Sequence, residues 1–249
     1  MRDDFANLNS ETVDPERRQR YVAELFDNLA HKYDRFNRWV TFFRDDTWRR
    51  NTVELLDDQA TGVILDLAAG TGNLAGQALK AGSRQVHVFD ISRAMLAQAK
   101  SKLSDKNNYT GKVALEQGSA NFLPYMNCSF NGVVSGFAMR NVFHFLDDVL
   151  NETFRVLKPG GRFAILELSR PETSLLRLGF RLHMRTIMPL IGRLATGQGA
   201  PFKYLYQTTM TFLSPTQFKQ SLQNAGFVEI DFKSYLLGGI AIHYGKKSQ

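Results

Sequence analysis

From residue 63 onward, short runs of apolar residues alternate with longer stretches of helical spacing. The runs that we expect to form strands are 63–67, 86–90, 113–117, 133–137 and 162–168. Their largely apolar character, bounded by turn residues, is typical of strands that are buried on both faces of a sheet. Strands that alternate with helices require right-handed crossovers, so the pattern predicts a parallel sheet covered by helices.

Several helix boundaries are marked by capping residues. Ser92 is placed to cap the helix after the second strand, and Ser-Pro at 214–215 supplies an N-cap and a first-turn proline for a helix that closes at Gly226. A helix from about 145 to 157 meets Lys-Pro-Gly-Gly at 158–161. This sequence indicates a helix stop and a turn into the next strand.

The last two expected strands, 228–235 and 240–244, are separated only by residues 236–239. A crossover helix does not fit into so short a connection, so the two strands should form a hairpin. The sequence therefore predicts an α/β fold: a doubly wound, Rossmann-like sheet of seven strands, mostly parallel, that ends in an antiparallel hairpin.

The segment before the sheet predicts a helical cap. An aromatic-rich stretch at 33–48 follows a first set of apolar residues at helical spacing, which are Tyr21, Val22, Leu25, Phe26 and Leu29. With 249 residues, 43% of them hydrophobic, the chain can bury one full core. We assign 1–60 to an N-terminal helical cap and 61–249 to the core of one single domain, with a basic amphipathic insertion at about 171–213.

Composition narrows the partners and the compartment. The 31 Lys and Arg residues against 24 Asp and Glu give a formal charge of +7, which favours anionic partners such as nucleic acid, phosphate-bearing ligands or lipid surfaces. Cys128 has no second cysteine to pair with, and we expect it to be buried as a small hydrophobe. Residues 1–20 lack an apolar signal region, and no run of roughly 18 uncharged apolar residues occurs, so we expect a cytoplasmic protein without a spanning helix.

The sequence Asp-Leu-Ala-Ala-Gly-Thr-Gly at 66–72 directly follows the first strand, where glycines let the backbone approach a ligand. The glycines also fit a dinucleotide fingerprint, with Asp90 at the distance expected for a ribose-binding acid. Asp66 favours another ligand, because a carboxylate there would repel a pyrophosphate but attract the ammonium group of a methionine moiety. We therefore expect S-adenosylmethionine (SAM) and no metal, and we keep NAD as the alternative.

We expect the cofactor groove at the carboxyl ends of the strands. Ser119 and Ala120 follow the third strand, where a hydroxyl and a backbone N–H could meet the adenine edge. Tyr33 could close over the methionine end, although core packing explains a tyrosine there almost as well. The remaining expected cofactor contacts are Asp66, Ala68, Gly70, Thr71, Gly72, Asp90, Ile91, Met95 and Gly136.

Three segments resemble the ubiquinone/menaquinone biosynthesis C-methyltransferase family: DLAAGTG at 66–72, FAMRNV at 137–142 and RVLKPGGRFAILELS at 155–169. The second and third are highly specific, and the resemblance extends from about Tyr33 to the end of the chain. It implies a class I methyltransferase that methylates a ring carbon of a polyprenylated quinol with SAM as the donor. Demethylmenaquinol is the favoured acceptor, and the methoxy-benzoquinol of ubiquinone synthesis is the alternative.

The chain departs from the family pattern at two positions near the cofactor loop. Asn73 stands where the family usually has an acid, and Ser119 stands where it usually has Asp or Asn.

Methyl transfer to carbon is an in-line displacement, so the protein should act mainly by holding the methyl group and the ring carbon within about 3 Å, away from water. Arg140 and Asn141 follow the fourth strand; we expect Arg140 to stabilise the quinolate and Asn141 to orient it. A structural salt bridge is the alternative for Arg140. His243 is a candidate base for the ring proton, and a packed core histidine is the alternative there.

A basic amphipathic segment spans 173–196. Its arginines recur at multiples of four residues, at positions 177, 181, 185 and 193, with apolar residues between them, and we expect a bend at Pro189. Such a helix could rest peripherally in an anionic headgroup layer and admit the quinol. A cap helix with a solvated arginine face is the alternative.

Rival functions use the same features differently. A nicotinamide oxidoreductase would use the glycine loop, and a nucleic-acid methyltransferase would use the positive charge. The chain has no Asn/Asp-Pro-Pro-aromatic motif and no recognisable RNA-binding module, so we expect no nucleic-acid partner. A binding protein without turnover is a third alternative, and a homo-oligomer remains open.

Overall fold

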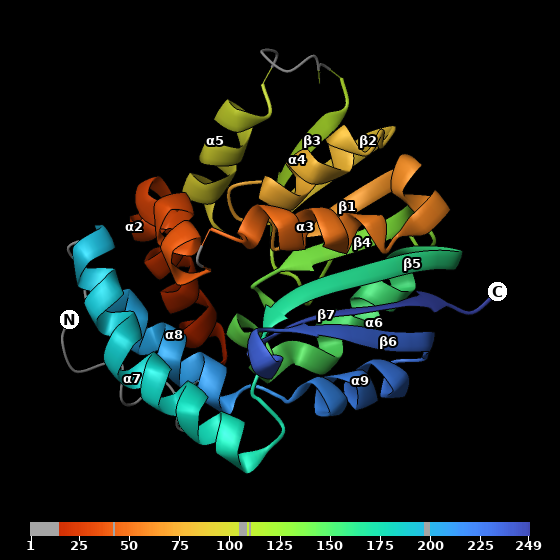
Figure 1. Ribbon diagram of the computed structural model, residues 1–249. Coiled ribbons are helices and arrows are strands. Elements are labelled where there is room, and N and C mark those ends of the chain that lie inside the picture. Colours follow the sequence, from red (N-terminus) through yellow and green to blue (C-terminus); the bar gives the residue numbers. More distant parts are fainter. Residues whose placement is uncertain (1–14, 42, 105–108, 110, 197–199) are drawn as a thin grey trace.

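A computed structural model describes residues 15–41, 43–104, 109, 111–196 and 200–249. One sheet runs through it in the strand order β3-β2-β1-β4-β5-β7-β6 (Figure 1). The strands are β1 (Val63–Leu67), β2 (Gln85–Asp90), β3 (Val113–Gln117), β4 (Phe130–Gly136), β5 (Leu157–Leu168), β6 (Phe227–Tyr235) and β7 (Ile240–Lys247). The order reverses between β1 and β4, where ligands of doubly wound sheets bind.

The predicted fold class is confirmed. Strands β1 to β5 pair in parallel, whereas β7 pairs antiparallel with both β5 and β6. Tyr235 lies opposite Ile240 at the closed end of the predicted hairpin, which turns through η5 (Leu236–Gly238).

Helices cover both faces of the sheet and its carboxyl edge (Figure 1). One face carries α3 (Asp45–Glu54), η1 (Asp57–Thr61), α4 (Asn73–Lys80) and α5 (Arg93–Lys102). The other face carries α6 (Leu146–Val156) and α9 (Pro215–Asn224), preceded in the chain by the short turns η3 (Met139–Asn141) and η4 (Phe143–Phe145). The helices α2 (Pro15–Val40), α7 (Ser174–Thr196) and α8 (Ala200–Thr211) gather beyond the carboxyl ends of the strands.

The strand sequences explain why both faces are covered. Ile64 packs in the cluster under α3, α4 and α5, whereas its neighbour Leu65 packs in the cluster under α6 and α9, and both are fully buried. Successive side chains of a strand point to opposite faces, so a continuous apolar run fills two cores.

The predicted helix caps are present. The Ser92 hydroxyl accepts a hydrogen bond from the Met95 N–H at 3.1 Å, and Ser214 forms a reciprocal capping box with Gln217. Gly226 follows α9 with φ +94°, a left-handed conformation that suits glycine.

Some predicted boundaries were wrong. β4 begins at Phe130 rather than at 133, and β5 begins at Leu157, so the expected turn at 158–161 lies inside an irregular strand. Phe130 pairs with Leu157, and the register then shifts before Gly132 pairs with Arg162. Cys128 is exposed rather than buried, because it occupies a left-handed turn (φ +57°) just before β4.

The cap and the basic segment also differ from expectation. The cap pattern predicted one helical stretch over residues 21–29 and a second at 33–48. In the structure α2 runs through the first stretch and into the second as far as Val40, and α3 begins at Asp45. α7 continues past Pro189 as one helix, and the bend expected there stays a prediction. Met184 and Met188 are buried, whereas Leu178 and Leu182 are exposed together with Arg181 and Arg185. The side chains of Ile187, Ile191, Arg193 and Leu194 lie outside those described.

No helix in the described ranges is long and apolar enough to cross a membrane.

Candidate active site

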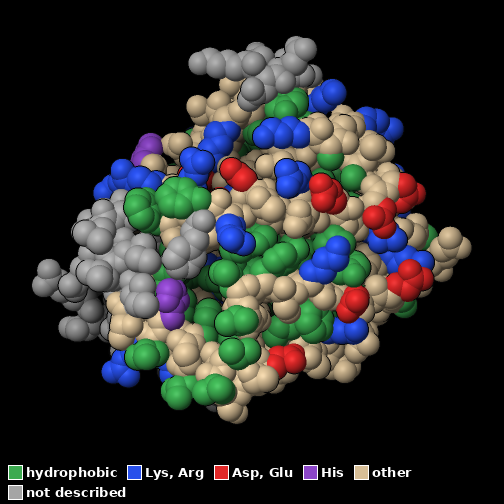
Figure 2. All heavy atoms as spheres, viewed as in Figure 1, with side chains coloured by type: hydrophobic (Ala, Val, Ile, Leu, Met, Phe, Trp, Pro, Cys, Tyr) green, Lys and Arg blue, Asp and Glu red, His purple; other side chains and the backbone are tan. Residues whose placement is uncertain are grey.

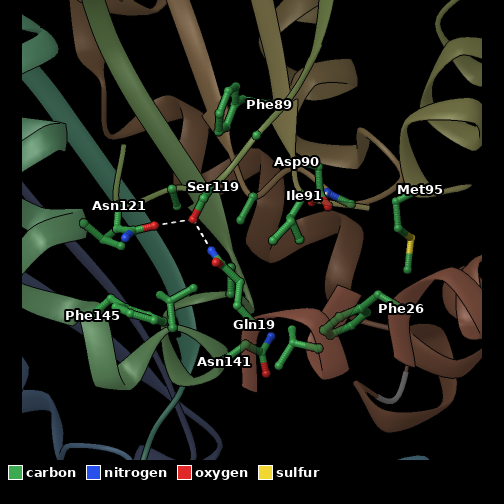
Figure 3. Close-up of a pocket in the computed structure, with 18 of the residues that line it drawn as sticks. Gln19, Phe26, Phe89, Asp90, Ile91, Met95, Ser119, Asn121, Asn141 and Phe145 are labelled. Atoms are coloured by element: carbon green, nitrogen blue, oxygen red, sulfur yellow. Dashed lines mark hydrogen bonds between the residues drawn. The ribbon is translucent and has the colours of Figure 1, made fainter. Parts of the chain in front are cut away.

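A cavity opens at the carboxyl ends of β1 to β4 and encloses about 850 Å³ when its open mouth is included. Figure 3 shows Gln19 and Phe26 reaching into it from α2, on the side opposite Phe89, Asp90 and Ile91. Nine of the predicted cofactor residues line this catalytic cavity: Tyr33, Ala68, Gly70, Asp90, Ile91, Met95, Ser119, Ala120 and Gly136.

A smaller pocket of about 300 Å³ shares residues with the catalytic cavity and contains two further predicted residues, Asp66 and Thr71. Arg49 of α3 also lines it, held by a 2.9 Å ion pair with Asp45. A negative side chain, Asp66, and a positive one, Arg49, therefore line the same small polar pocket as Tyr33. This pairing suits the two charged ends of an amino acid.

Asp66 is fully buried at the end of β1. Its Oδ2 accepts a hydrogen bond from the Ala75 N–H at 2.8 Å, and among the described residues its Oδ1 has no partner. Burial raises the pKa of Asp66 to about 7, although the Ala75 N–H and the charge of Arg49 oppose that rise. A buried carboxylate oxygen without a partner, aimed at a pocket, fits the ammonium group of SAM.

The residues of the glycine loop at 66–72 have two different roles. Ala68 (φ +53°) and Gly70 (φ +56°) turn the backbone along the catalytic cavity. Gly72 lines neither pocket; a Cβ there would lie 3.0 Å from Ala99 and 3.0 Å from Leu103. Gly72 is therefore placed to let the start of α4 lie close to Ala99 and Leu103, and its predicted contact with the cofactor stays a prediction.

Asp90 ends β2 and is only 8% exposed. Its two carboxylate oxygens accept hydrogen bonds from the N–H groups of Gly70 (2.7 Å) and Ser92 (2.8 Å). Burial raises its pKa to about 6, partly offset by these N–H groups. Each oxygen keeps a lone pair, so Asp90 can still accept hydrogen bonds from ribose hydroxyls.

The helix α2 lies across the cavity and is fastened to the loops at three points. Gln19 donates a hydrogen bond to the Ser119 hydroxyl, and Asp27 accepts one from the Ser92 hydroxyl. Asp34 accepts hydrogen bonds from Thr71 (2.6 Å) and from the Asn73 amide (2.9 Å), and it forms an ion pair with Lys102. Burial opposes ionisation of Asp34, but these donors hold its pKa below the ordinary value.

The sequence did not single out Gln19 or Asp27, because a polar residue on an exposed helix face has no distinguishing pattern. Asn73 and Ser119, where the chain departs from the family pattern, both contact α2.

Of the predicted catalytic pair, only Asn141 is among the described residues that line the cavity. Asn141 lines the cavity, and its Oδ1 accepts a hydrogen bond from the Tyr204 hydroxyl at 3.1 Å. Arg140 is buried and forms a 2.7 Å ion pair with Glu167, while the same nitrogen donates to the Phe137 carbonyl. Its side chain thus makes the structural salt bridge that was the alternative for this residue, although its Nε has no partner among the described residues.

His243 lies away from the cavity. Its Nε2 is 2.9 Å from the Pro215 carbonyl, and its ring packs between Phe218 and Phe232. Burial lowers its pKa to about 4. The geometry does not place His243 near a substrate, and we do not propose it as the base. His144, which the sequence did not single out, lines the cavity three residues after Asn141.

The fold and the site together define a class of protein. A SAM-dependent methyltransferase from Thermotoga maritima, described as a possible histamine N-methyltransferase, shares the fold with a TM-score of 0.63 and 17% identity, over 90% of this chain and 99% of that one. Human N-acetylserotonin methyltransferase gives a TM-score of 0.57 and 20% identity, over 91% of this chain and 59% of that one. The chain has the class I SAM-dependent methyltransferase fold.

Sequence comparison identifies the family. The model of the ubiE/COQ5 methyltransferase family matches residues 14–247. A demethylmenaquinone methyltransferase of Symbiobacterium thermophilum is 36% identical over 94% of this chain and 95% of its own length. A ubiquinone/menaquinone biosynthesis C-methyltransferase UbiE of Desulfotalea psychrophila is 36% identical over 91% of this chain and 90% of its own length. The chain belongs to the ubiE/COQ5 methyltransferase family, and the predicted enzyme class, SAM-dependent C-methyl transfer, is confirmed.

Proposed function

We propose that this enzyme methylates a ring carbon of a polyprenylated quinol, with demethylmenaquinol as the favoured acceptor. The family match over residues 14–247 carries this proposal. The cavity supports it, because Val142, Phe145 and Val149 provide an apolar wall for an aromatic ring. The methoxy-benzoquinol of ubiquinone synthesis is the second candidate, since the relative from Desulfotalea psychrophila is named for both quinones.

When bound, SAM supplies an electrophilic methyl group on a sulfonium. The ring carbon gains a bond to that methyl group as the carbon–sulfur bond breaks, and the ring then loses its proton. The enzyme must therefore orient the ring, favour an ionised ring hydroxyl and accept one proton.

We assign the orienting role to Asn141, whose side chain is itself held by the Tyr204 hydroxyl. Arg140 would aid the quinolate indirectly: its charge is paired with Glu167, and it would position the 137–141 backbone beside the cavity through Phe137 and Glu167. His144 is our candidate for the proton acceptor, because it lines the cavity and an imidazole titrates near neutral pH.

The methionine end of SAM would lie between Asp66 and Arg49, with Tyr33 above it. Asp90 would hold the ribose, and Ser119 and Ala120 the adenine edge. α2 would then close over the cofactor, because its three fastening points lie on the loops after β1, β2 and β3.

The proposed membrane contact lies on α7. The outward face of α7 carries exposed Arg181, Arg185 and Leu182, which suit an anionic lipid surface where a polyprenyl quinol resides. Flotation with vesicles that contain anionic lipid, compared with neutral vesicles, tests this surface. An Arg181→Glu/Arg185→Glu variant should lose the anionic-lipid dependence; equal flotation with both vesicle types would refute it.

The acceptor is tested with SAM and two reduced substrates, demethylmenaquinol and the benzoquinol precursor, by the mass gain of one methyl group. Arg140→Ala should reduce turnover steeply while SAM binding, measured by calorimetry, survives. Near wild-type turnover of that variant would remove Arg140 from the mechanism.

A further inference from the structure

A second cavity lies between α7 and the loop that joins β6 to β7. It measures about 840 Å³ and is lined by apolar side chains, among them Val40, Leu176, Phe180, Met184 and Ile240. His183 is the one titratable side chain in this lining within the described part of the chain, and burial lowers its pKa, which favours the neutral form. Figure 2 shows hydrophobic side chains over α7 and η5 on this face of the molecule. We call this cavity the α7 groove.

The α7 groove adjoins the catalytic cavity. Phe137 lines the catalytic cavity and belongs to the same packed cluster as Val40, Leu168 and Met188, which line the groove. α2 also passes from one to the other, since Tyr33 lines the catalytic cavity and Val40 lines the groove. The two cavities have no described lining residue in common, so a molecule that occupies both has to displace packed side chains around Phe137.

We propose that the α7 groove holds the polyprenyl tail of the quinol whose ring is methylated in the catalytic cavity, an inference that rests on the proposed function. A flexible hydrocarbon chain needs no hydrogen-bond partners and gains by leaving water. The groove offers it carbon-lined space on the far side of the Phe137 cluster from the ring site. A lipid acyl chain or a second protein copy has no ring to place in the catalytic cavity, so the closeness of the two spaces favours the quinol tail.

Gly179 allows the groove to be narrowed without disturbing the fold. It lies in α7 and lines the groove, and a Cβ there would meet no atom within 4 Å. Its replacement also raises helix propensity. Gly179→Phe should therefore fold and obstruct the groove, and Gly179→Ala should give an intermediate effect. Leu178→Phe is the matched control, because Leu178 is 63% exposed and is not among the lining residues.

The kinetic test compares quinols with one and with four prenyl units. Each unit that the groove buries should lower KM by roughly tenfold, since its apolar surface resembles that of a leucine side chain. We expect a much lower KM for the four-unit quinol than for the one-unit quinol in wild-type enzyme and in Leu178→Phe. In Gly179→Phe the ratio of the two KM values should shrink at least tenfold, while kcat for the one-unit quinol is retained. Equal tail preference in wild-type enzyme and Gly179→Phe would overturn the proposal.

A binding measurement separates this inference from the proposed function. Geranylgeraniol has a tail and no quinol ring, so calorimetry with it needs no turnover. If geranylgeraniol binds wild-type protein and Gly179→Phe weakens that binding at least tenfold, the result supports the α7 groove as a tail site. This holds even if neither quinol is methylated. Failure to methylate either quinol would refute the proposed acceptor instead. No difference between the two proteins, or geranylgeraniol binding without any tail preference in turnover, would overturn the tail site.

Discussion

Replacing Asp66 with asparagine should stabilise the ligand-free protein while it weakens SAM binding. Asp66 is fully buried, and burial raises its pKa from 3.8 to about 7. A difference of about three pKa units corresponds to roughly 4 kcal/mol between folded and unfolded chains. The substituted side chain carries no charge, and its carbonyl oxygen can still accept the Ala75 N–H that Asp66 accepts now.

The sign of the pH dependence follows from the raised pKa. Below pH 4 the carboxyl is protonated in both states, so ionisation costs no stability. Between pH 4 and pH 7 the unfolded chain releases the proton and the folded chain keeps it, so wild-type stability falls. The pH-dependent part of the stability gained by Asp66→Asn should therefore be roughly 1.5 kcal/mol at pH 5 and about 4 kcal/mol above pH 7. Asp90, whose pKa is also raised, is present in both proteins, so most of its contribution cancels in the difference; the remainder is its repulsion with Asp66, the last of the causes that shift the pKa of Asp66.

Urea denaturation of the ligand-free proteins at pH 5 and pH 8 measures this difference. Calorimetry with S-adenosylhomocysteine then measures the functional cost: loss of a buried charged hydrogen bond should weaken binding by roughly tenfold to a hundredfold. Methylthioadenosine lacks the amino-acid part and should bind both proteins alike. A stability difference that does not change with pH, or equal loss of both ligands, would refute the reasoning.

Three further predictions follow from the same geometry. Arg49→Met should weaken S-adenosylhomocysteine binding by about tenfold and leave methylthioadenosine unaffected in calorimetry, because Arg49 faces Asp66 across the small pocket. His144→Gln should lower kcat by about a hundredfold, whereas His243→Gln should stay within about twofold in the same steady-state assay; the reverse order would restore His243 as the base. Gly72→Ala should cost roughly 1–3 kcal/mol in urea denaturation, because it combines a φ of +74° with a contact of 3.0 Å to Ala99; unchanged stability would contradict this role.

The alternation of apolar runs and amphipathic stretches was sufficient to predict the fold. β1, β2 and β3 begin or end within a residue of the expected limits, because near-continuous apolar runs bounded by turn residues have few other solutions. The Ser92 and Ser214 caps were predictable for a related reason, since a capping bond joins residues only three positions apart.

Local sequence also predicted most of the residues that line the two pockets of the candidate site. Asp66, Gly70 and Asp90 lie at strand ends, and parallel strands bring their carboxyl ends to one edge of the sheet. Residue type and position at a strand end were therefore sufficient to predict that these three residues lie at the same edge of the sheet.

Tertiary packing decided the remaining features, because they depend on residues far apart in the chain. Arg140 meets Glu167 and His243 meets Pro215, and the sequence around either residue does not reveal these contacts. The contact between Gln19 and Ser119, which lie 100 residues apart, exists only because α2 folds back over the strand ends. The α7 groove likewise forms only where α7 packs beside η5, since apolar positions on a helix specify a buried face but not the neighbour that covers it.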